Sequence, residues 1–121
     1  MAAYYQRMKR HVQHELEEAC DAEMGGRPRV AFSHLERAHI LGQRSTRLHV
    51  LAHWRMMRWA IRQQQCSEVF GQLLRVVGAV LTTRIGLVPI GNTGGSNVSG
   101  FQIMPVPLDL QAIIDAEDAK S

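Results

Sequence analysis

Apolar residues recur every three or four positions through the first two-thirds of the chain, the spacing of amphipathic helices. The spacing predicts four helices, over residues 4–24, 28–41, 48–63 and 67–83. Gly25-Gly26 and Gly42 follow the first two, where glycine commonly ends a helix. Ser45 or Thr46 is suited to cap the third. Because the connections are short, neighbouring helices should run antiparallel.

The pattern changes after residue 84. Residues 85–107 hold three of the four prolines and five of the ten glycines, so a helix cannot continue there. Apolar residues among these turn formers predict an ordered loop packed on the helices; they are Ile90, Val98, Phe101, Ile103 and Met104. A short helix is expected from Asp109 to near Ala116, followed by a fraying tail.

Together these elements predict an all-α fold. We expect one helical domain over residues 1–121, a compact bundle of two antiparallel helical hairpins. Within it, residues 4–84 form the bundle, 85–107 the packed Gly/Pro-rich loop, and 108–121 the short terminal helix and tail. The length of 121 residues and the 45% apolar and 21% charged content fit one globular domain.

Charge and cysteine content narrow the function classes. A net charge of +3 is small for a protein that binds nucleic acid, so that partner is not expected. The N-terminus lacks the apolar core of a signal peptide and no apolar run could span a bilayer, which predicts a cytoplasmic protein without a membrane partner. Cys20 and Cys66 lack CxxC spacing and are interpreted as small buried residues.

The third predicted helix carries two histidines on the side expected to face inward. Its water-facing stripe is defined by Arg55, Arg58 and Arg62. His49 and His53 lie nearly opposite that stripe and are one helical turn apart. We therefore expect both side chains to be buried and to point toward the second helix.

The second helix offers matching groups. His34 and His39 lie on the two shoulders of its apolar face, and Glu36 shares one side with His39. Glu15 lies on the inward side of the first helix. A buried imidazole without a partner costs about 1–3 kcal/mol, so these residues need either a ligand or hydrogen bonds.

A transition metal ion would satisfy them, because neutral imidazoles and a carboxylate can converge on it at about 2.0–2.2 Å. The predicted ligands are His39, His49 and His53, with Glu36 or Glu15 as carboxylate and His34 as a further candidate. Zinc is the default for this donor set, and copper, nickel or iron also fit. The alternative is a hydrogen-bonded polar core, and the sequence leaves both open.

A second function class follows from residues 37–67, which contain six arginines and no acidic residue, with Trp54 and Trp59 among them. Such a face could bind an acidic protein or nucleic acid, although a solvated helix face has the same composition. No motif for nucleophilic catalysis is present, so a binding protein is favoured over an enzyme. A metalloenzyme with an open coordination position is left open, although no substrate element is recognisable. The sequence leaves a homodimer or another protein partner open.

The GNTGG segment, residues 91–95, lacks the GK[ST] ending of a phosphate loop. We interpret it as a turn in which the glycines adopt positive φ, while Asn92, Thr93 and the nearby Asn97 make local hydrogen bonds.

Two strings carry a family resemblance: FSHLERAHILGQRSTRLHVLAHW at 32–54 and VPIGNTGGSNVSGFQIMPVP at 88–107. With them, nearly the whole chain resembles a small bacterial family known as a domain of unknown function. The resemblance implies that Glu15, His34, Glu36, His39, His49, His53 and the GNTGG loop belong to the family pattern. It implies no established activity.

Overall fold

The computed structural model describes residues 2–84, 91–95 and 103–120. Within this part the chain forms five helices: α1 (Ala2–Met24), α2 (Pro28–Gly42), α3 (Thr46–Arg62), α4 (Cys66–Arg84) and α5 (Leu108–Asp118). The described residues contain no strand, which confirms the all-α prediction. Each predicted helix matches an observed one, with ends that differ by no more than two residues.

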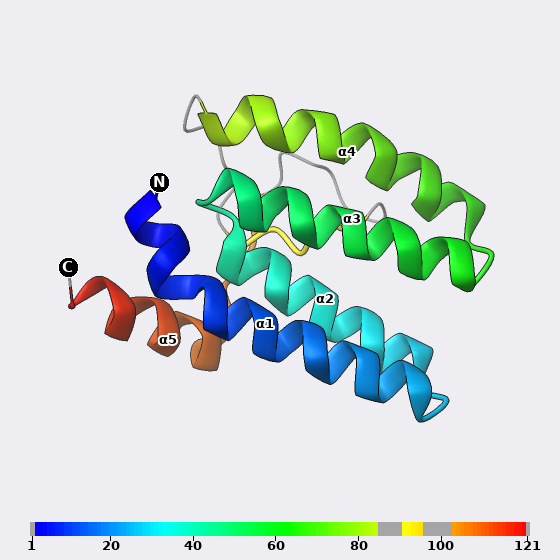
Figure 1. The fold of residues 1–121 in the computed structure, drawn as a ribbon, viewed down its shortest axis with the longest axis horizontal. Helices are drawn as coiled ribbons and strands as arrows, with labels where there is room; N and C mark the ends of the chain where they lie inside the picture. Colours follow the sequence, from blue (N-terminus) through cyan, green and yellow to red (C-terminus); the bar gives the residue numbers. More distant parts are fainter. Residues whose placement is uncertain (1, 85–90, 96–102, 121) are drawn as a thin grey trace.

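The helices form two hairpins that stack with α2 next to α3 (Figure 1). α1 packs along α2 and α3 along α4, while contacts between α2 and α3 join the hairpins. α5 lies across the bundle against α1 and α2. Among the described helices, α4 contacts α3 alone and therefore stands at one edge. None of the described helices has both the length and the apolar content needed to cross a bilayer.

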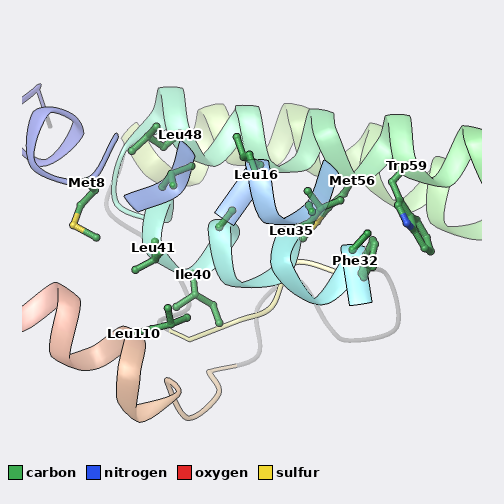
Figure 2. Packing of buried hydrophobic residues seen from close by; sticks show 14 of the residues in the cluster. Met8, Leu16, Phe32, Leu35, Ile40, Leu41, Leu48, Met56, Trp59 and Leu110 are labelled. Carbon is green, nitrogen blue, oxygen red and sulfur yellow. The ribbon is translucent and has the colours of Figure 1, made fainter. Parts of the chain in front are cut away.

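The apolar core is built mainly by α1, α2 and α3 (Figure 2). Met8, Leu41 and Met56 are fully buried, and burial of such a side chain stabilises the fold by about 1.5–3 kcal/mol. Trp59 is also buried, and its indole Nε1 donates to the Pro28 carbonyl at 3.0 Å. The core thus fixes how α2 and α3 face each other.

Gly42 does not stop α2 but forms its last residue. A Cβ at this position would lie 2.7 Å from the Leu48 Cβ, so only glycine lets α2 pass this close to α3. Ser45 then caps α3, its Oγ accepting from the Leu48 N–H at 3.4 Å. This tight corner holds the second helix beside the third.

The described part of the GNTGG loop is tightly packed. Gly91 and Gly94 have positive φ, and the Asn92 Oδ1 accepts from the Gly94 N–H at 2.9 Å, as predicted. The Gly91 N–H donates to Gln43 Oε1 at 3.1 Å, which ties the loop to the end of α2. Residues 91–95 are therefore an integral part of the bundle.

Two side-chain predictions are wrong. Ile103 was expected to anchor the loop but is 76% exposed; instead Val106 packs against the core. Of the other expected anchors, Met104 is half-buried, and Ile90, Val98 and Phe101 lie outside the described residues, as does the predicted turn residue Asn97. Cys20 and Cys66 are both exposed rather than buried, because the core sides of α1 and α4 are filled by other residues.

Candidate metal centre

Three imidazoles from α2 and α3 meet in the interior of the bundle. His39 comes from α2, and His49 and His53 from successive turns of α3. All three are buried, and their ring centroids lie 4.6–4.9 Å apart. One ring nitrogen from each lies within 4.8 Å of the other two, the one such group of three or more potential ligands in the described part of the chain. We call these residues the histidine triad.

The hydrogen bond of His39 defines which of its nitrogens is free to bind. Nδ1 lies 2.7 Å from the backbone carbonyl oxygen of Asn92. A carbonyl oxygen can only accept, so Nδ1 carries the proton and donates. In a neutral imidazole the other nitrogen, Nε2, then carries a lone pair.

His53 is fixed in the same way by a side chain of α4. Its Nδ1 lies 2.5 Å from Gln72 Oε1. The Gln72 amide cannot be turned around, because its Nε2 donates at 2.7 Å to both Glu68 Oε1 and the Gly94 carbonyl. Gln72 Oε1 therefore accepts from His53, and the His53 Nε2 also carries a lone pair.

These two lone-pair nitrogens face each other. The His39 Nε2 lies 3.1 Å from the His53 Nε2. Two neutral imidazoles held in these tautomers cannot share a hydrogen bond across that distance, since neither Nε2 has a proton to give. A cation shared by the two nitrogens, a proton or a metal ion, would make the contact favourable. Two nitrogens on a tetrahedral zinc ion, with Zn–N bonds of about 2.0–2.1 Å, are about 3.4 Å apart, close to this spacing.

Burial disfavours the proton. Desolvation lowers the pKa of His39 well below its ordinary value, and charge on His53 or His49 would lower it further. The pKa of His49 falls to about 3, through burial and then the proximity of His53. Burial is also the main reason that the pKa of His53 falls to about 4. All three imidazoles are therefore neutral near pH 7, the form that binds metals.

The GNTGG loop closes over this arrangement. A Cβ on Gly94 would lie 2.7 Å from two atoms of the His39 ring, so the bare glycine backbone packs directly on the imidazole. Arg75 holds the loop from α4, donating to the Gly94 carbonyl at 2.9 Å and to the Gly95 carbonyl. Loop, α2 and α4 together set the orientation of His39 and His53.

Two other predicted ligands lie in a different cluster. Glu15 accepts from Arg37 Nε at 2.7 Å, and His34 Nδ1 lies 3.3 Å from its second oxygen. Arg37 also donates to Asp109 Oδ2 at 2.5 Å, which joins α5 to the cluster. We call Glu15, His34, Arg37 and Asp109 the Glu15–Arg37 cluster. Its members are absent from the group of ligand atoms that surrounds His39.

Glu36 occupies a third environment. It lines an open cleft of about 780 Å³ together with Phe32, Trp59 and Glu68. Burial raises its pKa, while a hydrogen bond with Thr93 acts in the opposite direction. Glu36 is one turn before His39 on α2 but does not belong to the group of three ligand atoms.

No orienting role was predicted for the groups that hold the triad. Gln72 is a buried polar residue of α4, but the apolar pattern of that helix does not show that its side faces α3. The contribution of Asn92 comes from its backbone carbonyl, which no side-chain pattern reveals. Gly94 was expected to support a turn, but its contact with His39 depends on tertiary packing.

Comparison with known proteins gives a family but no function. Neither the curated proteins nor the solved structures contain a match. One family model, described as a protein of unknown function, matches residues 6–114. That span includes the histidine triad and the GNTGG loop, and it confirms the resemblance to a domain of unknown function. The chain therefore belongs to the DUF3703 family.

Proposed function

We propose that this chain is a cytoplasmic protein that binds a transition metal ion through the histidine triad, in order to sequester or transfer it. The observation that carries the proposal is the pair of lone-pair nitrogens on His39 and His53, which face each other at 3.1 Å while Asn92 and Gln72 hold both Nδ1 protons. Metal-binding histidines commonly have this second hydrogen bond, because it orients the ring and fixes the tautomer.

The donor set favours a borderline divalent ion. Three neutral imidazoles suit zinc, and copper, nickel or iron are accepted by the same nitrogens. Glu36 remains the candidate for a carboxylate ligand, since it lies on α2 one turn before His39. Glu15 and His34 are weaker candidates, because Glu15 already neutralises Arg37.

The second function class, a basic face for an acidic partner, has less support. Three of its six arginines form ion pairs within the chain: Arg37 with Glu15, Arg44 with Asp118 and Arg62 with Glu23. Trp59 lies in the core, so Trp54 alone of the two tryptophans is available to stack on a partner. These three arginines therefore stabilise the bundle and are less available to bind an acidic partner.

Metal content and metal-dependent stability test the proposal. The full chain, purified without an affinity tag, should contain a transition metal by mass spectrometry or take up one equivalent of zinc in a calorimetric titration. Because the folded triad binds metal better than the unfolded chain does, saturating zinc should raise the urea midpoint of the metal-free protein. A midpoint that zinc, copper, nickel and iron all leave unchanged would contradict the proposal and identify the triad as a polar core.

A further inference from the structure

The outer side of α4 carries a continuous apolar stripe. Its side chains are 52–69% exposed, and they are Phe70, Leu73, Leu74, Val77 and Leu81. Four of them follow intervals of four, three and four residues, the repeat by which one helix packs along another. Gln72 and Ala79 are buried on the opposite side, against α3. The helix thus has two contact faces, and one has no partner within the described structure.

The stripe has no charge of its own. The charged side chains of the helix up to residue 81 are Glu68 and Arg75, and both are turned to other groups. Glu68 accepts from Gln72, and Arg75 donates to the GNTGG loop. A protein of net charge +3 would ordinarily repel its own copy, but two such stripes can meet without placing like charges opposite each other.

The exposed area suits a small specific interface. Each side chain of the stripe presents on the order of 100 Å² of apolar surface, so two copies would bury roughly 1,000 Å², about the minimum for a specific contact. A contiguous apolar surface of about 500 Å² is comparable to the largest apolar patch of a typical monomer, and such patches are often functional. Its heptad-like spacing is complementary to a helix with the same spacing, which a second α4 provides.

We propose that the chain forms a homodimer in which α4 packs antiparallel against α4 of a second copy. A two-fold axis at the middle of the stripe makes the contact self-complementary. Leu74 then faces Val77 of the partner subunit, and Phe70 faces Leu81 of the partner subunit. The interface lies on the side of α4 that faces away from Gln72 and includes no triad residue, while Phe70 and Leu74 also line the cleft that contains Glu36.

Sedimentation equilibrium on the full chain tests this contact. The wild type should sediment at twice the chain mass in the micromolar range. Leu74→Glu should raise the dimer dissociation constant by about 100-fold or more, since it buries an unpaired charge in the contact. Val77→Lys should do the same. Both positions are exposed, so the variants should keep the wild-type circular dichroism spectrum. Leu108→Glu, at an 89% exposed position on α5, is the matched control and should remain dimeric.

Mixing the two variants tests the antiparallel arrangement. Glutamate at position 74 of one copy would face lysine at position 77 of the other, so the mixture should form a heterodimer although each variant alone is monomeric. A mixture that stays monomeric, or a Leu74→Glu variant that stays dimeric, refutes this arrangement. A monomeric wild type overturns the proposal altogether, whether the stripe then binds phosphatidylcholine vesicles or is covered by another segment of the same chain.

Discussion

Helix α2 contributes to two polar clusters that satisfy their buried groups in opposite ways. In the Glu15–Arg37 cluster, carboxylates and a guanidinium neutralise one another, and Arg37 reaches both Glu15 and Asp109. In the histidine triad, the outer nitrogens of His39 and His53 donate to carbonyl oxygens, but the inner nitrogens face each other without a proton. The first cluster is complete as it stands, whereas in the second two lone pairs face each other.

Buried polar groups that pair with one another inside the fold differ from buried groups that keep lone pairs without a donor. Glu15 and His34 were predicted as further ligands of the same site as the triad histidines, because Glu15 lies on the inward side of its helix and His34 on the shoulder of an apolar face. The structure divides them by chemistry: opposite charges collect at the partly exposed side, and neutral imidazoles at the buried one. The number of buried polar residues is therefore less informative than the question of whether each lone pair has a donor.

The largest expected difference between the clusters is in metal affinity. His53→Ala removes one of three ligands and should weaken zinc binding by about 100-fold or more. Arg37→Ala, the matched change in the Glu15–Arg37 cluster, should leave the zinc dissociation constant within about threefold, because it touches no triad residue. Calorimetric titration of both metal-free variants measures this. Equal losses in the two variants would show that the clusters act as one site.

Two glycines test whether the GNTGG loop orients the histidine triad. Gly94 and Gly26 both have positive φ, but a Cβ on Gly94 would meet the His39 ring at 2.7 Å, whereas Gly26 has nothing within 4 Å. Gly94→Ala should displace His39 and weaken zinc binding by about 10–100-fold. Gly26→Ala should cost only the backbone strain, about 1 kcal/mol of unfolding free energy, without changing zinc affinity. If both variants bind zinc like the wild type, the loop does not orient His39.

The helices and the burial of the triad could be predicted from the sequence, but the partners of individual site residues could not. The arginine stripe on α3 determined which side faces water, and His49 and His53 are indeed buried and directed toward His39. Glu15 was placed correctly on the inner side of α1, but its choice of Arg37 depends on the rotation of α1 against α2. That rotation is set by packing of the whole core and not by periodicity within either helix.

Helix α4 shows a second limit of prediction from the sequence. Its most apolar side is the exposed stripe, while the side that packs on α3 contains Gln72 and Ala79. Apolar periodicity locates such a helix correctly but points to the wrong face as the buried one. Gln72 could not be identified as the partner of His53, because a lone glutamine has many structural roles and its acceptor is fixed only by Glu68 and Gly94.

Acid should affect the two clusters in different pH ranges. The histidines of the triad have a lower pKa folded than the ordinary 6.5, so the unfolded chain takes up protons first as the pH falls. Their contribution to stability is complete above about pH 6.5 and is lost toward the folded values of about 3 and 4 for His49 and His53. The carboxyl of Asp109 has a lowered pKa beside Arg37, so its contribution is lost only at lower pH.

Between pH 6.5 and 5, each triad histidine should therefore reduce the unfolding free energy of the metal-free protein by up to about 1.4 kcal/mol per pH unit. Urea unfolding across this range measures the slope. His53→Ala should make the slope shallower, and Arg37→Ala should leave it unchanged. Identical slopes in all three proteins would mean that the triad histidines are not held neutral in the folded state.

The smallest expected effect concerns the geometry of the charged cluster. Arg37 uses Nε for Glu15 and a terminal nitrogen for Asp109, so its planar fork bridges α1 and α5. Arg37→Lys keeps the charge but can reach only one of the two carboxylates well, and should lower the unfolding free energy by about 0.5–1 kcal/mol. Added salt should shrink this difference, since Asp109 is exposed. Zinc affinity should not change, because the substitution leaves every lone pair of the triad as it was. A lysine variant as stable as the wild type in low salt would show that the bridge between α1 and α5 contributes nothing to stability.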